Sequence, residues 1–333
     1  MTHPDLEPSV SLPTSDSSTN SSPMKSPVPH DKIRCIEVAG TSLDNSGPFA
    51  TPEFWREEAA RRHPGNTHLV EVFAAPWTTQ LLCTPNSGRL WRSKRRTLLK
   101  ELSESYAALR RVRAQAEHAC GADGTGLVVF DVCSGKGVAS LLLSVALPGC
   151  RVVMVDSNAK MDLSHLSGRA NVEFHALSVY DDAAIGSLFA REARGAAWCV
   201  MVGTHLCGAL SPRLIELYCR ELDGVGSTVH GLILSPCCLK GWLGKTAQRK
   251  AEAAAGEGGA EAVRAAAARA AGFQASSYAC LLAELHGLLL SHAGGSVADV
   301  AQVEYDEQVL SPVNGFLVAT RRASSTSAVE RQT

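Results

Sequence analysis

Residues 129–143 read VFDVCSGKGVASLLL, and the fold prediction starts from this stretch. An apolar run reaches Asp131, the chain turns through Gly135 and Gly137, and a second apolar run begins at Val138. Glycines permit a tight turn and a close approach of the backbone to a ligand, and a helix that begins there presents unpaired N–H groups. The pattern therefore predicts a strand, a ligand-binding turn and a helix.

Short apolar runs rich in β-branched residues recur after this stretch. We expect strands at 127–132, 151–156, 171–177, 198–203 and 229–235, with helices at 138–147, 180–194 and 211–222. Apolar strands that alternate with helices indicate a parallel sheet covered on both faces. The eight residues EQVLSPVN between the runs 300–306 and 315–321 are too few for a crossover helix. The prediction is an α/β fold with a seven-stranded, mostly parallel sheet and a terminal antiparallel strand.

Composition predicts how the rest of the chain is organised. Residues 1–30 are dominated by Ser, Thr, Pro and Asp and cannot bury enough apolar area to offset their ordering entropy, so we expect a disordered tail there, and another at 323–333. Residues 31–126 form a predicted N-terminal extension. Residues 127–322 form the predicted sheet domain, with an Ala-rich helical insertion at about 245–292.

The extension contains a stretch, 89–118, that combines an apolar helical stripe with many basic side chains. The stripe consists of Leu99, Leu102, Tyr106, Leu109 and Val112. The basic residues are Arg89, Arg92, Lys94, Arg95, Arg96, Lys100, Arg110, Arg111 and Arg113. Such a face can be a solvated helix surface, or a patch that contacts phosphate groups beside an active site. The formal net charge of the chain is −1, so any binding of nucleic acid must come from a local patch of this kind.

Several classes of protein are disfavoured by composition. There is no run of about 18 uncharged apolar residues, so no membrane span is expected. The first residues lack the basic and apolar regions of a secretory signal. The eleven cysteines are an odd number scattered through apolar segments, which favours reduced thiols in a cytoplasmic or nuclear setting. No segment indicates an oligomeric state.

An acidic residue that follows the turn in sequence indicates which class of ligand the turn binds. Asp156 ends the second predicted strand, 19 residues beyond Gly137. A carboxylate there accepts hydrogen bonds from both hydroxyls of a ribose, so a nucleoside-bearing ligand is expected. A dinucleotide and S-adenosylmethionine (SAM) both meet this condition, and a turn that binds no nucleotide is the remaining alternative. The dinucleotide fingerprint needs a third glycine where this chain has Ser140, which disfavours a nicotinamide-dependent oxidoreductase.

Two further polar segments follow predicted strands, GTHLCGALSPRLIEL at 203–217 and LSPCCLKGW at 234–242. Ligands in open α/β sheets lie outside the carboxyl ends of the strands, so both segments are expected beside the glycine turn. His205 suits proton transfer from an acceptor hydroxyl or amine, or else only fixes its loop.

The adjacent Cys237 and Cys238 leave three alternatives open. They can be a small buried pair that shapes the acceptor pocket, or ligands of a metal ion together with His205 and Cys207. They can also supply a thiolate that attacks a pyrimidine ring, as in 5-methylcytosine formation. We assign His205, Cys237 and Cys238 as candidate catalytic residues and assign no metal.

The segments VCSGKG, THLCG and SPCC, in this order, resemble a family of class I SAM-dependent methyltransferases. The family includes eukaryotic tRNA 2′-O-methyltransferases and the methyltransferase domain of a protein with a glutathione S-transferase C-terminal module. The resemblance covers residues 127–321 and implies a Rossmann-like class I methyltransferase fold with SAM as cofactor. The implied cofactor contacts are Asp131, Ser134, Gly135, Lys136, Gly137, Asp156, Ser178, Gly203 and Thr204.

The chain departs from the family pattern at three places. Cys133 stands where the motif has its first glycine; provided that its backbone conformation is open to other residues, we expect a tolerated small side chain. The acid that often follows the third strand is Ser178 here, with Asp181 and Asp182 nearby. The zinc-binding modules of the tRNA enzymes have no counterpart in residues 1–120.

The predicted function is a SAM-dependent methyltransferase that transfers a methyl group to RNA of the tRNA kind by in-line displacement. RNA is expected to bind through residues 89–113. The alternatives are methyl transfer to a protein or a small molecule, and a module that binds SAM or RNA without catalysis.

Overall fold

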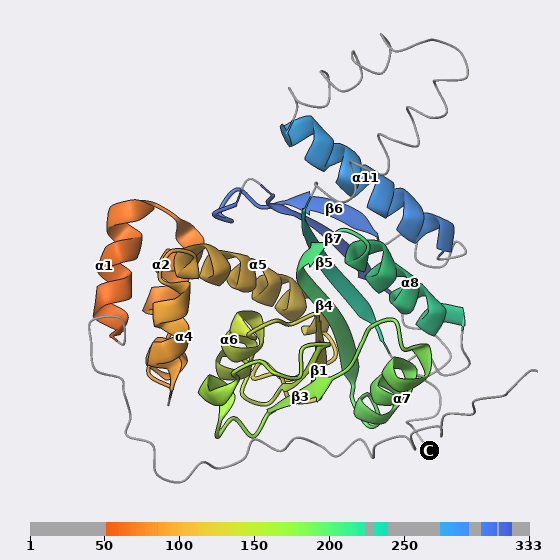
Figure 1. The fold of residues 1–333 in the computed structure, drawn as a ribbon, viewed down its shortest axis with the longest axis horizontal. Coiled ribbons are helices and arrows are strands. Elements are labelled where there is room, and N and C mark those ends of the chain that lie inside the picture. The colour runs from red at the N-terminus through yellow and green to blue at the C-terminus, as the bar shows by residue number, and fades with distance from the viewer. Residues whose placement is uncertain are drawn as a thin grey trace, which may run out of the picture. The chain divides into compact units, whose positions relative to one another are not determined.

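A computed structural model describes residues 51–84, 86–223, 229–238, 274–292, 301–311 and 313–321. Figure 1 shows how their helices and strands are arranged. The predicted tails at 1–30 and 323–333, and much of the predicted insertion at about 245–292, lie outside the described residues.

Within the described residues, seven strands form one sheet in the order β3-β2-β1-β4-β5-β7-β6. The strands are β1 (Leu127–Val132), β2 (Arg151–Asp156), β3 (Val172–Ala176), β4 (Trp198–Cys207), β5 (Gly231–Cys238), β6 (Gln302–Tyr305) and β7 (Gly315–Thr320). The first five pair in parallel, and β7 runs antiparallel to both of its neighbours. This order is that of the Rossmann-like class I methyltransferase fold, so the predicted fold class is confirmed.

Helices cover both faces of the sheet because alternate residues of each strand are apolar on opposite sides. One apolar cluster includes α1 (Pro52–Arg62), α2 (Thr67–Ala74), α3 (Thr78–Leu82), α4 (Ser87–Lys94), α5 (Leu98–Ala116) and α6 (Val138–Ala146). The other includes α7 (Asp182–Glu192), α8 (Leu210–Asp223) and α11 (Gln274–His292). Figure 1 shows α5 and α6 on one side of the sheet and α7 and α8 on the other.

The predicted basic stretch 89–118 forms two helices, α4 and α5, and not one. Residues 102–109 of α5 are all buried, because the helix lies between the sheet and α2. The buried surface of α5 is therefore wider than the apolar stripe predicted from helical spacing. Within the described residues, no helix has the length and apolarity needed to cross a bilayer.

α5 runs antiparallel to the parallel strands, which brings its first turns to the ends of β4 and β5. Near its C-terminus, the side-chain amide of Gln115 donates to the carbonyl oxygens of Leu232 and Ala319 at 3.4 and 3.0 Å. Leu232 lies at the start of β5, so the opposite end of α5 points to the edge at which the parallel strands end. We call this edge the carboxyl edge.

An ion-pair network joins the N-terminal helices to the end of β6. His68 of α2 and Arg111 of α5 both contact the carboxylate of Asp306, at 2.9 and 3.1 Å. Burial would raise the pKa of Asp306, but the hydrogen bonds from His68 and Arg111 outweigh it and lower the pKa to about 2. The helices before residue 127 and the sheet are therefore packed as one unit.

Candidate functional site

The turn between β1 and α6 contains three residues with positive φ. Cys133, Gly135 and Gly137 have φ values of 57°, 52° and 70°. The N–H of Ser134 donates to the carbonyl oxygen of Val155 at 3.1 Å, which ties the turn to β2. The turn thus lies at the N-terminus of α6, where backbone N–H groups favour a negatively charged ligand group.

The two glycines of the turn have different surroundings. A Cβ atom on Gly137 would lie 2.5 Å from Cε of Met154, and its φ of 70° is a conformation that side chains rarely adopt, so the position favours glycine. A Cβ atom on Gly135 would have no heavy atom within 4 Å. Next to it, the buried Oγ of Ser134 has no hydrogen-bond partner among the described residues. A ligand can therefore approach the backbone at Gly135.

Cys133 adopts the left-handed conformation that the motif's usual glycine would adopt without strain. The expected condition of an ordinary backbone region is not met, and the conformation costs a non-glycine residue about 1 kcal/mol. Burial, together with the carboxylates of Asp156 and Asp131, raises the pKa of its thiol to about 12. The thiol therefore stays protonated near neutral pH and is no nucleophile.

Asp156 lies at the end of β2, beside the turn. Its Oδ2 accepts the N–H of Gly135 at 3.0 Å, and its Oδ1 accepts the N–H of Asn158 at 2.9 Å. An ionised carboxylate offers about four acceptor positions, so about two remain on this partly buried group. Two vicinal hydroxyls need two acceptors. The geometry fits the predicted contact with a ribose.

Asp131 is buried beneath the turn, with an exposed fraction of 1 %. The hydroxyl of Ser140, in the first turn of α6, donates to its carboxylate. Burial raises the pKa of Asp131 to about 6, although the bond from Ser140 lowers it. Ser140, which stands in place of the third glycine of a dinucleotide fingerprint, thus joins α6 to β1. The buried Asp131 stabilises the turn through this bond.

The ends of β4 and β5 carry a β-bulge each. Their register slips twice beyond Thr204, and the slips leave His205 as an extra residue on β4 and Cys237 as an extra residue on β5. His205 accordingly has a φ of 61°. Bulges re-aim side chains and are frequent beside active sites. Both strands extend beyond their predicted ends at 203 and 235, so the expected loop residues belong to bulged strand ends.

The two bulges contact each other. The thiol of Cys237 donates to the carbonyl oxygen of His205 at 3.1 Å, and the thiol of Cys207 donates to the same oxygen at 3.4 Å. The two Sγ atoms are 2.7 Å apart. From the sequence, Cys207 is placed with Cys237 and Cys238 only in the metal-site alternative, and the structure brings Cys207 and Cys237 into contact. The side chain of Cys238 lies outside the described part of the structure.

Glu104 of α5 belongs to the site and was missed by the sequence analysis. Its side chain is 5 % exposed, and its Oε2 lies 2.6 Å from Nε2 of His205. The two atoms are at ion-pair distance but are not aligned as a hydrogen bond. The Nζ atom of Lys100 lies 2.7 Å from Oε1 of Glu104. The buried carboxylate is therefore placed to stabilise a positive charge on the imidazole.

The remaining predicted cofactor residues have mixed surroundings. Lys136 and Ser178 are exposed, and Thr204 is half-buried. A Cβ atom on Gly203 would lie 2.1 Å from Cδ1 of Leu206, so packing and not ligand access accounts for that glycine. The nearby acids have other partners: Asp181 caps α7, and Asp182 forms ion pairs with Arg213 and Arg220.

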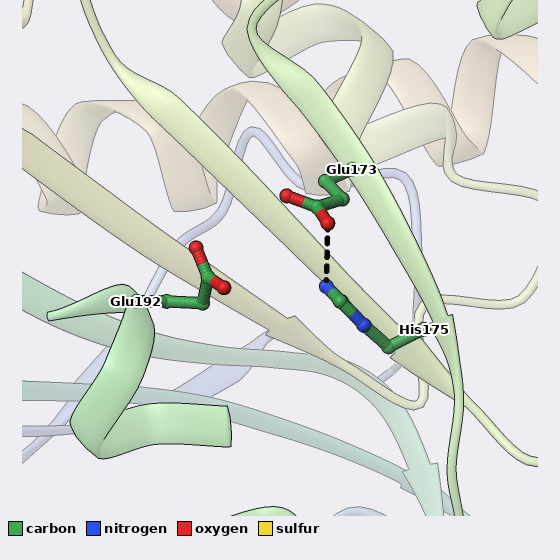
Figure 2. Close-up of side chains that lie close together, drawn as sticks. All are labelled: Glu173, His175 and Glu192. Atoms are coloured by element: carbon green, nitrogen blue, oxygen red, sulfur yellow. Dashed lines mark ion pairs between the residues drawn. The ribbon is translucent and has the colours of Figure 1, made fainter. Parts of the chain in front are cut away.

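A second cluster of metal-ligand residue types lies on β3 and α7. Nε2 of His175 lies 3.4 Å from Oε1 of Glu173. Figure 2 shows both side chains, with the carboxylate of Glu192 facing them from the end of a helix. Both oxygens of Glu192 are engaged by guanidinium groups, Arg151 at 3.1 Å and Arg191 at 2.6 Å. A divalent cation would have to compete with these two positive charges. The cluster is accounted for as a charge network.

No family model matches the sequence, and no curated protein matches it. Solved structures overlap with the chain at low sequence identity. A protein-(glutamine-N5) methyltransferase (release factor-specific) from Alicyclobacillus acidocaldarius is 12 % identical, with 67 % of this chain and 93 % of that chain covered and a TM-score of 0.33. The plantazolicin methyltransferase BpumL in complex with SAH is 10 % identical, with 80 % and 100 % covered and a TM-score of 0.38.

An O-methyltransferase family protein from Burkholderia thailandensis is 12 % identical, with 82 % of this chain and 72 % of that chain covered and a TM-score of 0.34. At such identities and TM-scores, none of these overlaps bears on the ligand or the substrate of this chain. The fold assignment comes from the strand order and the antiparallel β7.

We predict that Asp131→Asn removes a pH dependence of stability. Because burial raises the pKa of Asp131 above the usual 3.8, its protonated form stabilises the fold at low pH, and this contribution is lost as the pH rises through about 6. In urea unfolding, the stability of the wild type relative to Asp131→Asn should fall by on the order of 2 kcal/mol between about pH 4 and about pH 7.5.

The control for this comparison is Asp123→Asn, at an exposed carboxylate whose pKa is lowered by hydrogen bonds from Thr125. Its stability difference should not fall over the same interval, because a lowered pKa has the opposite sign of linkage. A wild type whose stability tracks that of Asp131→Asn at every pH would contradict the assignment of a buried, late-ionising carboxyl group.

Proposed function

We propose that this chain is a SAM-dependent methyltransferase. The proposal rests on one juxtaposition at the carboxyl edge of the sheet, where the open space at Gly135 adjoins the remaining acceptor positions of Asp156. Open α/β sheets bind ligands at this edge, near the point where the strand order reverses between β1 and β4. The role of Ser140 supports SAM over a dinucleotide, because the dinucleotide fingerprint has a glycine at this position to let the helix pack closely on the strand, whereas Ser140 bonds to Asp131.

The residues present fit this cofactor. Asp156 would hold the ribose hydroxyls, the backbone at Gly135 and the unpartnered Oγ of Ser134 would face the ligand, and the exposed Ser178 would lie towards the base. When bound, SAM supplies a methyl group activated by its sulfonium charge. The chain then has to place an acceptor atom in line with that methyl group and to take up a proton.

His205 is the residue that takes up this proton in the proposal. Its side chain is 38 % exposed, so an acceptor hydroxyl or amine can reach the ring from solvent. The imidazolium that results would be stabilised by the carboxylate of Glu104, whose other oxygen contacts Lys100. Glu104 is therefore a positioning residue that acts through His205.

We expect titration calorimetry to show that the wild type binds SAM and that Asp156→Ala weakens binding at least about tenfold, because a charge-assisted hydrogen bond contributes about 1.5–3 kcal/mol. The matched control is Asp162→Ala. Like Asp156, Asp162 accepts a backbone N–H two residues further along the chain, from Ser164 at 3.1 Å. Unlike Asp156, it accepts no hydrogen bond from the glycine turn within the described residues. Folded wild type without SAM affinity, or equal losses in the two variants, would overturn the proposal.

Catalysis is separated from binding by the fate of a labelled methyl group. Wild type incubated with methyl-labelled SAM and fractionated cell extract should place label in one fraction, and RNA, protein or small molecules are then distinguished directly. SAM binding without label in any fraction would show a binding module that has no turnover.

We predict that Glu104→Gln lowers kcat for methyl transfer by about 10- to 100-fold while leaving KM for SAM unchanged, because it removes only the charge that stabilises a protonated His205. Glu101→Gln is the control, since Glu101 lies one turn before Glu104 on α5 and likewise pairs with a lysine, Lys94 of α4. In a His205→Asn background, Glu104→Gln should cause no further loss, because asparagine tolerates a positive φ but takes up no proton. Additive losses would contradict the coupling.

We propose RNA as the acceptor, and the position of the basic stretch supports this. The Nζ atom of Lys136, in the glycine turn, contacts Oγ of Ser93 in α4 at 3.4 Å. The exposed Arg92, Arg95 and Arg96 therefore lie on a segment next to the turn. Three other basic residues of the stretch, Lys94, Lys100 and Arg111, form ion pairs with Glu101, Glu104 and Glu304.

We predict that reversing Arg92, Arg95 and Arg96 to Glu weakens RNA binding and reduces the slope of log affinity against log salt by about 2, as expected for three lost contacts to single-stranded RNA. The control carries the same change in charge at the exposed Arg61, Arg62 and Arg194. Binding that does not depend on salt, or equal losses in both triple variants, would exclude the patch as the RNA contact.

A further inference from the structure

Cys207 and Cys237 are in contact at the carboxyl edge, where the bulged ends of β4 and β5 lie side by side. Their Sγ atoms are 2.7 Å apart, and both thiols donate to the carbonyl oxygen of His205. Cys207 is exposed and Cys237 is partly buried. The two residues are thirty positions apart in sequence and come from neighbouring strands, so their contact exists only in the folded chain.

We propose that Cys207 and Cys237 form a reversible dithiol–disulfide site, oxidised by a low-molecular-weight disulfide of the glutathione class. The reaction takes place in two exchange steps. The thiolate of the exposed Cys207 attacks one sulfur of glutathione disulfide, which breaks that S–S bond and releases one glutathione thiolate. The thiolate of Cys237 then attacks Sγ of Cys207, forms the intramolecular S–S bond and releases the second glutathione.

The exchange is balanced in atoms and electrons. The two protein thiols lose two electrons and two protons, and the glutathione disulfide gains both pairs as it becomes two glutathione molecules. Reduced glutathione in excess reverses both steps. The site therefore responds to the ratio of the two glutathione forms and needs no reagent beyond them.

The geometry favours the second step over a lasting mixed disulfide. The two sulfur atoms are 2.7 Å apart, and a disulfide has an S–S distance of about 2.05 Å, so only a small movement brings them to bonding distance. Because Cys237 is already beside its target, the attack has a high effective concentration. The bulges make this possible, since Cys207 pairs in register with Cys238 and would not otherwise face Cys237.

Several other cysteines are poor competitors for the oxidant. Burial raises the pKa of Cys133, Cys150 and Cys199 to about 12 in each case, so little thiolate forms at neutral pH. Cys280 is exposed, but it lies on α11, on the face of the sheet that α7 and α8 also cover. It serves as the control for a single exposed thiol.

Oxidation changes the site as well as the thiols, and this consequence rests on the proposed function. In the disulfide neither sulfur carries a proton, so the carbonyl oxygen of His205 loses both S–H donors. His205 is held in a left-handed conformation that costs a non-glycine residue about 1 kcal/mol, and those donors help to hold it. Oxidation should therefore displace the imidazole from Glu104 and lower methyl transfer.

We predict that the full-length protein, equilibrated with graded ratios of reduced and oxidised glutathione, acid-quenched and alkylated, yields a linked peptide pair containing Cys207 and Cys237. The disulfide should exceed the glutathione adduct at these positions by about tenfold or more. Mass spectrometry of the digested protein is the measurement. It uses no SAM and no acceptor, so its failure would overturn the redox site and leave the proposed function standing.

Single cysteine-to-serine variants identify the two residues that form the disulfide. Cys238→Ser should keep it, and Cys237→Ser should abolish it and leave Cys207 as a glutathione adduct. Cys280→Ser should change nothing at the pair. A link that survives Cys237→Ser, or a Cys207 that carries only glutathione in the wild type, would overturn the proposal.

The effect of the disulfide on methyl transfer is tested in a separate experiment. Methyl transfer by the wild type should fall on oxidation and return on reduction, whereas the double variant Cys207→Ser, Cys237→Ser, which can form neither the disulfide nor the adduct, should lose this reversible response. A disulfide that forms without any change in activity would overturn the coupling to His205 but not the redox site. Reduced protein without methyl transfer would overturn the proposed function alone.

Discussion

A hydrogen bond from the backbone N–H of Gly135 to the carboxylate of Asp156 is the interaction on which the site depends. It joins the turn after β1 to the end of β2, and it fixes which carboxylate lone pairs remain for a ligand. The bond forms because β1 and β2 pair in register up to Val132 opposite Val155, which places Asp156, the next residue of β2, beside the turn. A slip by one residue would move every side chain of the strand to the opposite, differently packed face of the sheet, so the position of the acid is held by the core.

The other half of the site depends on a buried charge. Glu104 lies on α5 between the sheet and α2, and a carboxylate that is buried without positive partners costs several kcal/mol. Lys100 provides such a partner for one oxygen, and the imidazole of His205 lies beside the other. The same requirement that makes the fold tolerate Glu104 thus fixes the orientation of an imidazole at the end of β4. Stability and the chemistry proposed for this edge are coupled through one carboxylate.

The sequence predicted the parts of the molecule that are local or periodic. Apolar runs predicted the strands, a short final connection predicted the antiparallel β7, and the spacing from Gly137 to Asp156 predicted two groups that the structure places together. Residues set by packing between distant segments were missed. Glu104 gives only a weak signal, an acid in the small and apolar run LSESYAAL, because helical spacing does not show that α2 covers its far side. The bulges at His205 and Cys237 carry no glycine that would mark them, so the sequence does not show that the thiol of Cys237 lies against Cys207 and the carbonyl oxygen of His205.

The place of α5 has a consequence for how the chain can be divided. A fragment that begins at Leu127 would contain every recognisable motif of the turn and of the strand ends, yet it would lack Glu104. It would also bare the apolar side of β4, where Val200 and Val202 are fully buried in the intact chain. Such a fragment would tend to self-associate through that bared surface. The smallest autonomous piece of this protein is therefore longer than the piece that its motifs delimit.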